Sequence, residues 1–457
     1  MSRTTDFPRS PAEGIAAGRL PPEAYAEAFA DLHPPLTRHE ALVEADRCYF
    51  CYEAPCQKAC PTSIDIPLFI RQITAENDIG AAETILRANI FGGMCARVCP
   101  TETLCEEACV REYAEGKAVK IGLLQRHATD ALMATGRQPF TRAPATGRHV
   151  AVVGAGPAGL SCAHRLAMLG HSVTVYEAKT KPGGLNEFGI AAYKTPENFA
   201  QREVDFILSI GGIEIKFGQE LGRDIDLAGL RRQNDAVFLG LGLAGVNKLG
   251  LDGAPSGVRD AVEYIAELRQ APDLSRLPVG RRVVVVGGGM TAIDAAVQSK
   301  LLGAEEVTIV YRGAPDQMKA SEYEQELAQT TGVLIRHRAT PKALNGADGR
   351  LTGITFERTR DTGGRPERTG ETFTLDADMV LTAIGQKLVA DAFGGIEVLA
   401  LDGGRIAVDT ERRTSLSGVW AGGDCVAGGS DLTVSAVEDG KQAALSIDRA
   451  LGMAKAA

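Results

Sequence analysis

The sequence predicts an α/β fold in which two parallel-sheet domains, one nested inside the other, follow an α-helical domain rich in cysteine. A unit of strand, glycine turn, helix and strand begins at His149, and a second such unit begins at Val283. Eight of the ten cysteines lie between Cys48 and Cys109. We therefore expect a helical domain over 1–145, a first sheet domain split into 146–280 and 386–457, and an inserted sheet domain over 281–385.

The composition argues against several classes of protein. No stretch approaches 18 consecutive apolar residues, so no transmembrane helix is expected. The polar start of the chain, Met1 to Arg9, lacks the apolar region of a secretory signal. A net charge of −9 without any basic block argues against nucleic-acid binding. We expect a soluble cytoplasmic protein that binds neither nucleic acid nor a membrane.

The N-terminal domain is expected to be helical, with one helix around Pro22 to Leu32 in an otherwise Pro- and Ala-rich arm. From Cys48 to about Thr135 the helical pattern is broken by Cys-Pro pairs. Asp65 is a candidate N-cap, because Pro67 is tolerated in the first turn of the helix that follows. The proline- and glycine-containing stretch 137–148 predicts a linker to the sheet domains.

The cysteine array carries the strongest chemical signal. Cys48-x2-Cys51-x4-Cys56-x3-Cys60-Pro61 has the compact spacing of a ferredoxin-type loop, in which the cysteine before proline serves the other cluster. Cys99, Cys105 and Cys109 form a second group, and Cys95 would bring the count to the eight thiolates that two cubes need. Two [4Fe-4S] clusters are predicted. A zinc site and a disulfide framework are the alternatives.

The first glycine motif, Gly154-Ala155-Gly156-Pro157-Ala158-Gly159, follows a strand and opens a helix. Its glycines permit the tight turn, the close approach of a pyrophosphate and the close packing of helix on strand. Glu177, at the end of the next strand, can accept hydrogen bonds from ribose hydroxyls. The pattern predicts a Rossmann-like FAD-binding domain. Further cofactor contacts are expected from Gly184, Leu185, Gly423, Asp424 and Thr433.

The second glycine motif, Gly287-Gly288-Gly289-Met290-Thr291-Ala292, predicts a Rossmann-like nicotinamide-dinucleotide domain. The next strand ends in Tyr311-Arg312 instead of an acid. Arg312 could meet the 2′-phosphate of NADP(H), stack on adenine or lie in solvent, and these readings stay open. Lys319 is a second candidate contact or a surface lysine.

The remaining cysteines, Cys162 and Cys425, lie far apart in the sequence. This spacing excludes the paired thiols of thioredoxin reductases and disulfide reductases, and both residues are expected to be small buried apolar side chains. No acid–base pair and no histidine constellation stands out. No catalytic side chain is assigned, because hydride transfer to a flavin relies on the cofactor.

The order of these motifs, closed by Gly422-Gly423-Asp424, resembles the flavin/iron–sulfur module of glutamate synthase small subunits and dihydropyrimidine dehydrogenases. The likeness spans about residues 38–449. The five residues between Cys99 and Cys105, the run Leu124-Gln125-Arg126 and the segment 433–442 are similar to the dihydropyrimidine dehydrogenases. In that family the second cluster is held by three cysteines and a glutamine, and Gln125 stands at the matching position. The implied ligands are Cys48, Cys51, Cys56 and Cys109 for one cluster, and Cys60, Cys99, Cys105 and Gln125 for the other. Cys95 then becomes a bystander.

The same resemblance implies a function. The chain is similar to the bacterial NADH-oxidising subunit of NAD-dependent dihydropyrimidine dehydrogenase, an oxidoreductase acting on CH–CH groups. It implies FAD, two [4Fe-4S] clusters and NAD(H), with electrons passing to an FMN-containing iron–sulfur catalytic partner, two copies of each being expected. The partner would reduce uracil and thymine to their 5,6-dihydro forms, or run the reverse. The alternatives are the NADPH-oxidising small subunit of glutamate synthase, a related NAD(P)H:ferredoxin-type oxidoreductase, and a redox-sensing scaffold without turnover.

Overall fold

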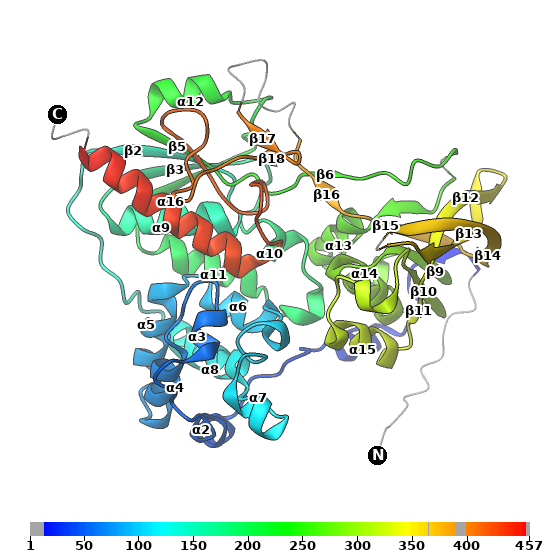
Figure 1. Ribbon diagram of the computed structural model, residues 1–457, viewed down its shortest axis with the longest axis horizontal. Helices are drawn as coiled ribbons and strands as arrows, with labels where there is room; N and C mark the ends of the chain where they lie inside the picture. Colours follow the sequence, from blue (N-terminus) through cyan, green and yellow to red (C-terminus); the bar gives the residue numbers. More distant parts are fainter. Residues whose placement is uncertain (1–12, 254, 364, 390–398, 454–457) are drawn as a thin grey trace. The chain divides into compact units, whose positions relative to one another are not determined.

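The computed structural model describes residues 13–253, 255–363, 365–389 and 399–453 (Figure 1). The chain divides into two compact units. The first unit comprises Met1–Leu32, Phe188–Pro196 and Val246–Gln386, and the second comprises His33–Glu187, Glu197–Gly245 and Lys387–Ala457. Among the helices described, none is long and apolar enough to cross a membrane.

The N-terminal part of the second unit is a layer of short helices. Asp65 accepts a hydrogen bond from the Leu68 backbone N–H at 3.1 Å, which confirms the predicted N-cap. Apolar residues recur on one face of the helix that it caps, and Phe69, Ile70 and Ile73 are buried there. The helices are α2 (Arg38–Asp46), α3 (Pro55–Ala59), α4 (Ile66–Thr74), α5 (Asp78–Ala88), α6 (Gly92–Val98), α7 (Val110–Glu115) and α8 (Ile121–Ala134).

The second unit also contains a parallel five-stranded sheet in the order β19-β5-β2-β3-β4. Its central strands read as unbroken apolar runs because helices cover both faces, and Val150 and Val152 are fully buried. The predicted C-terminal strand joins this sheet beside β5. The strands are β2 (His149–Val153), β3 (Ser172–Glu177), β4 (Ile213–Phe217), β5 (Ala236–Leu239) and β19 (Val419–Ala421).

Helices α9 (Pro157–Met168) and α16 (Thr433–Met453) pack along each other on this sheet (Figure 1). The Ser161 hydroxyl of α9 donates to the Val437 carbonyl of α16 at 2.7 Å. The first glycine motif and the C-terminal segment therefore meet, although they lie far apart in the sequence. The other helices of this part are α10 (Leu185–Phe188), α11 (Phe199–Leu208) and α12 (Leu227–Gln233), and a short ladder joins β17 (Leu401–Asp402) to β18 (Arg405–Ile406).

The first unit has its own parallel sheet, in the order β11-β10-β9-β15-β7. Its strands are β7 (Val258–Asp260), β9 (Arg282–Gly287), β10 (Glu306–Val310), β11 (Leu334–Arg336) and β15 (Met379–Ala383). An antiparallel meander of β12 (Ala339–Ala347), β13 (Arg350–Asp361) and β14 (Pro366–Asp376) lies between β11 and β15 in sequence. The helices of the first unit are α1 (Pro22–Ala28), α13 (Ala261–Gln270), α14 (Met290–Leu301) and α15 (Glu322–Thr330). Strand β7 belongs to this parallel sheet, and helix α13 packs against it. Both elements precede residue 281, where the sequence analysis begins the inserted domain. The domain limits stated from the sequence remain predictions.

The segment 188–196 also belongs to the first unit and is held there by a buried ion cluster. The Lys194 ammonium lies 2.8 Å from Asp294 and 2.7 Å from Glu324, and the Ala191 N–H donates to Asp294. Burial alone would lower the pKa of Lys194, but the two carboxylates outweigh it and raise the pKa. The ammonium stays charged. Removing one carboxylate would leave a buried, uncompensated charge.

Candidate functional site

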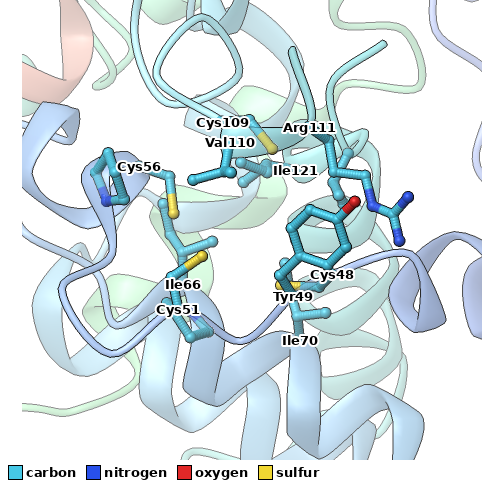
Figure 2. A pocket seen from close by; sticks show the side chains of 13 residues that line it. Cys48, Tyr49, Cys51, Cys56, Ile66, Ile70, Cys109, Val110, Arg111 and Ile121 are labelled. Carbon is cyan, nitrogen blue, oxygen red and sulfur yellow. The ribbon is translucent and has the colours of Figure 1, made fainter. Parts of the chain in front are cut away.

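Four of the predicted cysteine ligands surround one cavity, called here the first cavity (Figure 2). Cys48 and Cys51 come from the loop after α2, Cys56 from α3, and Cys109 from the residue before α7. Apolar side chains of α4 and α8, including Ile66, Ile70 and Ile121, complete the wall. Residues about sixty positions apart in the sequence thus face one space.

The residues that line a second cavity include Cys60, Cys95, Cys99, Cys105 and Gln125. Cys60 belongs to the same compact run as the cysteines of the first cavity, yet it lines the second. This division is the one that the ferredoxin-type spacing predicts for a cysteine before proline. Val434, from the start of α16, also lines this cavity. The cavity therefore has five candidate ligands for four positions.

The donor sets fit iron–sulfur clusters. In the described ranges no three His, Cys, Asp or Glu side chains are grouped closely enough to hold a single metal ion, and the cysteines are instead spread around cavities. Burial raises the pKa of the Cys56 thiol to about 12 and that of Cys105 well above its ordinary value. Thiolates in such surroundings need a compensating positive centre, and soft thiolate ligands suit iron.

Gln125 is oriented by its own hydrogen bond. The side chain is buried, and its Nε2 donates to the Gly92 carbonyl at 2.6 Å. An amide oxygen so close to that carbonyl would be repelled, so the amide nitrogen is the atom that faces Gly92. The bond directs Oε1 to the other side of the amide. The oxygen of this amide is a possible ligand, whereas the Cys95 thiol is hydrogen-bonded to Cys99.

We expect Gln125→Leu to lower the iron content, by up to about four atoms per chain, and to change the electron paramagnetic resonance signal of one cluster. The change removes the candidate ligand oxygen and leaves an apolar side chain of similar size. Cys95→Ser is the matched control at the same cavity and should leave both readouts unaltered. Loss of iron in Cys95→Ser, with Gln125→Leu unchanged, would exchange the roles of the two residues.

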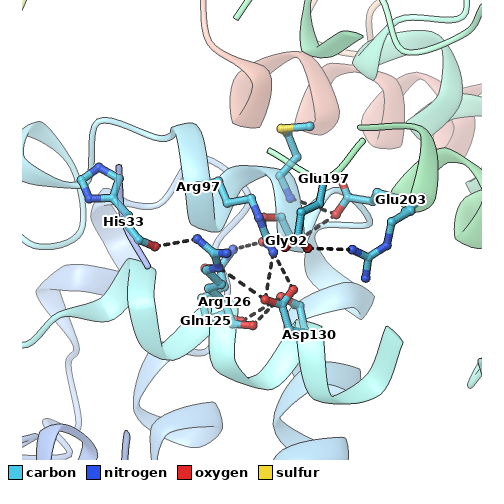
Figure 3. A network of polar contacts seen from close by, with 12 residues as sticks. His33, Gly92, Arg97, Gln125, Arg126, Asp130, Glu197 and Glu203 are labelled. Atoms are coloured by element: carbon cyan, nitrogen blue, oxygen red, sulfur yellow. Dashed lines mark hydrogen bonds and ion pairs between the residues drawn. The ribbon is translucent and has the colours of Figure 1, made fainter. Parts of the chain in front are cut away.

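Side chains from the sheet part of the second unit hold the start of α6, between Gly92 and Cys95 (Figure 3). Glu203 of α11 accepts hydrogen bonds from the backbone N–H groups of Gly93 at 2.8 Å and Met94 at 3.0 Å. Arg97 donates to both oxygens of Asp130 at 2.8 Å and lies over the Phe199 ring. Sequence reasoning missed this network, because each residue stands alone in its helix without a motif around it.

The stability of the chain should fall as the pH rises towards 8 because of Glu203. Burial raises the pKa of Glu203 to about 8, against the effects of the two N–H groups and Arg97, and its Oε2 is a buried atom without a hydrogen-bond partner in the described structure. Between pH 4.5 and 8 the folded chain holds a proton that the unfolded chain releases, so this contribution is complete at low pH and is lost above pH 8.

Glu203→Gln keeps an acceptor oxygen and cannot ionise. Its melting temperature should therefore exceed that of the wild type at pH 8.5 and lose that advantage at pH 5. Equal melting temperatures of the two proteins at every pH would contradict a buried, titrating Glu203. Glu197→Gln, at an exposed carboxylate, is the control.

The first glycine motif forms the predicted turn. Gly154 has φ +97°, and the Glu177 carboxylate accepts hydrogen bonds from the backbone N–H groups of Ala155 and Lys179, both at 2.8 Å. No side chain caps the N-terminus of α9, which starts at Pro157 and Ala158 after the extended Gly156. Its first N–H groups can therefore face a pyrophosphate. A Cβ at Gly159 would lie 1.9 Å from the Gly154 carbonyl, which explains the third glycine.

The other predicted flavin residues meet at the starts of α10 and α16. The Thr433 hydroxyl donates at 2.8 Å to Asn186, the neighbour of Leu185, and a Cβ at Gly184 would touch Gly156. The Gly423 N–H donates to Asp439 at 2.9 Å. Burial raises the pKa of Asp424 to about 6. Sequence reasoning missed Asn186 and Asp439, since only the pairing of distant helices brings them here. Cys162 and Cys425 are fully buried, as predicted.

The second glycine motif lies at the end of β9 in the first unit. A Cβ at Gly287 would meet the Ala383 carbonyl at 2.3 Å, and one at Gly288 would meet the Tyr311 ring at 2.3 Å. Nothing lies within 4 Å of a Cβ at Gly289, which leaves room before Met290 and Thr291 open helix α14. Arg312 and Lys319 are both exposed after β10. The Thr359 hydroxyl donates a hydrogen bond to the Arg312 backbone carbonyl at 2.6 Å, which fixes the main chain that carries the arginine.

The architecture consists of two parallel sheets with Rossmann-like glycine motifs and a layer of helices whose cysteines line two cavities. The sequence profile of the pyridine nucleotide-disulphide oxidoreductase family matches residues 148–440. The chain belongs to this family. A second profile, described as dihydropyrimidine dehydrogenase domain II, 4Fe-4S cluster, matches residues 25–137. This pyridine nucleotide-disulphide oxidoreductase is thus a flavin- and NAD(P)-dependent oxidoreductase with a 4Fe-4S domain, and the fold class predicted from the sequence is confirmed.

Relatives with similar sequences confirm the resemblance. The NAD-dependent dihydropyrimidine dehydrogenase subunit PreT of Salmonella typhimurium is 36% identical over 430 residues, covering 94% of this chain and 98% of the relative. PreT of Escherichia coli K12 is 36% identical over 429 residues, with the same coverage. The glutamate synthase [NADPH] small chain of Escherichia coli K12 is 33% identical and covers 91% of this chain and 92% of its own length.

Solved structures share the fold of the two sheet domains. FprA of Mycobacterium tuberculosis, a His57Gln mutant, superposes with a TM-score of 0.57 at 20% identity and covers 68% of this chain and 86% of its own. Thioredoxin reductase of T. acidophilum gives a TM-score of 0.53 at 22% identity and covers 66% of this chain and 99% of its own. At these identities the likeness concerns the fold alone.

Proposed function

We propose that the chain is the electron-input subunit of a dihydropyrimidine dehydrogenase. It takes two electrons from each NADH and delivers them one at a time, by way of two [4Fe-4S] clusters, to an FMN-containing partner subunit that reduces uracil or thymine to the 5,6-dihydro form, reversibly. FAD, when bound, supplies the exchange between two-electron and one-electron chemistry. The partner and substrate rest on the names of the PreT relatives, which are subunits of such an enzyme.

The observation that carries the proposal is the position of the second cavity. Val434 lines this cavity. The preceding residue, Thr433, donates a hydrogen bond to Asn186, which follows the predicted flavin contacts Gly184 and Leu185 in the sequence. One turn of α16 therefore spans from the candidate flavin site to the candidate cluster site. In this proposal Cys60, Cys99, Cys105 and Gln125 hold the cluster beside the flavin domain. Cys48, Cys51, Cys56 and Cys109 hold the other.

The roles of the chain's own residues follow from their positions. Gly154, Gly156 and Gly159 admit the pyrophosphate of FAD to the start of α9, and Glu177 accepts hydrogen bonds from ribose hydroxyls. Gly184, Leu185, Gly423, Asp424 and Thr433 contact the remainder of the cofactor. Gly287, Gly288 and Gly289 admit NADH to the start of α14.

The test is anaerobic purification of the tagged chain from its own host, with whatever accompanies it. Oxidation of NADH that depends on added uracil would support the proposal. Oxidation of NADPH that depends on glutamine and 2-oxoglutarate, without any response to uracil, would replace the proposal by the glutamate synthase small chain. That second candidate is favoured by one observation, the exposed Arg312 where an acid would select NADH. Reduction of a dye by NADH with neither substrate response would contradict both.

A further inference from the structure

Asn89 is a fully buried residue between helices α5 and α6, and it lines the second cavity. Its side-chain oxygen accepts a hydrogen bond from the Phe91 backbone N–H at 3.0 Å. A flipped amide would set two donors against each other, so the side-chain nitrogen, Nδ2, lies on the other side of the amide. In the described part of the chain, this buried nitrogen has no hydrogen-bond partner. A buried donor of this kind has lost its hydration without compensation, which is rare and calls for an acceptor outside the protein chain.

The main chain that carries Asn89 is fixed by cations from the sheet part of the second unit. Arg165 of α9 donates to the Arg87 carbonyl at 2.8 Å, and Lys441 of α16 donates to the Ala88 carbonyl at 2.9 Å. The last turn of a helix leaves such carbonyl groups without partners inside the helix, and basic side chains satisfy them. The position of the Asn89 amide at the end of α5 is therefore set by the protein alone.

The other polar side chains at the second cavity, apart from the cysteines, already have partners. The Gln125 nitrogen donates to the Gly92 carbonyl, and the Thr101 hydroxyl is hydrogen-bonded to Glu106. Among the described residues that line this cavity, Asn89 therefore has the one side-chain amide nitrogen that lacks a partner. An amide nitrogen donates and does not accept, so this atom is not a metal ligand.

The acceptors expected at the second cavity are sulfur atoms. Three of the candidate ligands there are thiolates, and an iron–sulfur cube adds sulfides. A hydroxyl already makes one such contact, since the Thr62 Oγ1 lies 3.3 Å from the Cys60 Sγ and donates to it once the cysteine is a thiolate. Hydrogen bonds to the sulfurs help to set the reduction potential of a cluster. A donor stabilises the more negative, reduced state more than the oxidised state, so it raises the potential.

We infer that the Asn89 amide donates a hydrogen bond to a sulfur atom of the iron–sulfur cluster in the second cavity and thereby raises the reduction potential of that cluster. The inference rests on the proposed function, in which that cavity holds a [4Fe-4S] cluster. The amide keeps both of its hydrogens in the two oxidation states, so no proton is transferred. Of the described residues that line the first cavity, none carries a side-chain amide. The effect is therefore specific to the second cluster.

The test compares Asn89→Leu with the wild type, both as anaerobically purified holoproteins. Leucine has a similar size but no donor. In a redox titration followed by electron paramagnetic resonance, the signal that Gln125→Leu alters should move to lower potential. The expected change is about tenfold in the one-electron equilibrium constant, which is about 59 mV. The other cluster should keep its potential. In deuterated buffer, the second cluster should also lose one magnetically coupled, exchangeable deuteron, which a merely structural role would not cause.

Asn89→Thr separates the donor from the turn that the side chain makes. Its hydroxyl oxygen can still accept from the Phe91 N–H, and a β-branched residue suits the extended backbone at this position, φ −139° and ψ 100°. It lacks the amide, so its potential should fall as in Asn89→Leu. Asn77→Leu is the matched control and should keep the wild-type potential. Asn77 caps the other end of α5, where its oxygen accepts from the Gly80 N–H at 3.0 Å, and it lines neither cavity.

Wild-type potential and deuteron coupling in both Asn89 variants, each with full iron, would overturn the inference and assign the amide to a buried water. A shift in Asn89→Leu alone would also overturn it, because the lost contact with Phe91 would then be the cause. If a variant fails to assemble the cluster, wild-type protein with isotopically labelled asparagine side-chain nitrogen decides: magnetic coupling of that nitrogen to the second cluster is expected, and its absence would refute the hydrogen bond. A wild-type preparation with flavin but without iron would instead refute the proposed function.

Discussion

Replacing Cys109 by alanine is expected to remove the iron of the first cavity and to abolish electron delivery to a partner. Cys109 is buried and is the one lining cysteine of this cavity that comes from the α7 side, whereas Cys48, Cys51 and Cys56 come from the opposing loop and α3. Without it, three thiolates on one side would have to hold a cube alone. The iron content should fall from about eight to about four atoms per chain.

The measurements are iron per FAD, the visible spectrum and two activities. Partner-dependent NADH oxidation should fall at least about a hundredfold, because the electrons then lack the cluster of the first cavity on their way to the partner. Ferricyanide reduction at the flavin should persist, since the glycine motifs are untouched. Cys162→Ala is the control: this cysteine is fully buried in α9, outside both cavities, and its replacement should leave the iron content unchanged. Full iron in Cys109→Ala would contradict the ligand set.

The sequence predicted the sheets well because their signals are local. The strand at His149–Val153 and the one that begins near Val283 are apolar runs followed at once by glycines. Both become central strands buried on two faces, which is the environment that such runs require. Strand β7 has only three residues and no following glycine motif, so its place beside β15 could be learned only from the three-dimensional pairing.

The distribution of the cysteines between the two cavities was only partly predictable from the sequence. The spacing within the compact run predicts that Cys60 serves a different cluster from Cys48, Cys51 and Cys56. It cannot show that Cys109 joins those three cysteines at the first cavity, because Cys109 lies about sixty residues after Cys48. It also cannot distinguish Cys95 from Gln125, because both face the second cavity. Glu203 and Lys194 carry no sequence signal, since a charged residue in an amphipathic segment is ordinarily solvated. Only tertiary packing buries these two ionisable side chains.

Replacing Gly159 by alanine is expected to abolish FAD binding and to destabilise the second unit by about 3 kcal/mol or more. The new Cβ would lie 1.9 Å from the Gly154 carbonyl oxygen and 3.2 Å from Val152, so backbone would have to move. That movement displaces α9 from the sheet and opens the turn whose N–H groups face the pyrophosphate. Flavin absorbance after purification, thermal melting and NADH-dependent ferricyanide reduction should all report the loss.

Gly156→Ala separates packing from ligand contact. A Cβ at this position meets only the Gly184 Cα at 3.8 Å, and the backbone conformation, φ −81° and ψ −176°, is open to any residue. The apoprotein should therefore melt within a few degrees of the wild type. FAD should nevertheless bind at least about tenfold more weakly, because the methyl group occupies the space that a pyrophosphate needs. If Gly156→Ala instead lowers stability as much as Gly159→Ala does, or retains FAD at wild-type affinity, then this glycine serves the fold and the dinucleotide does not approach here.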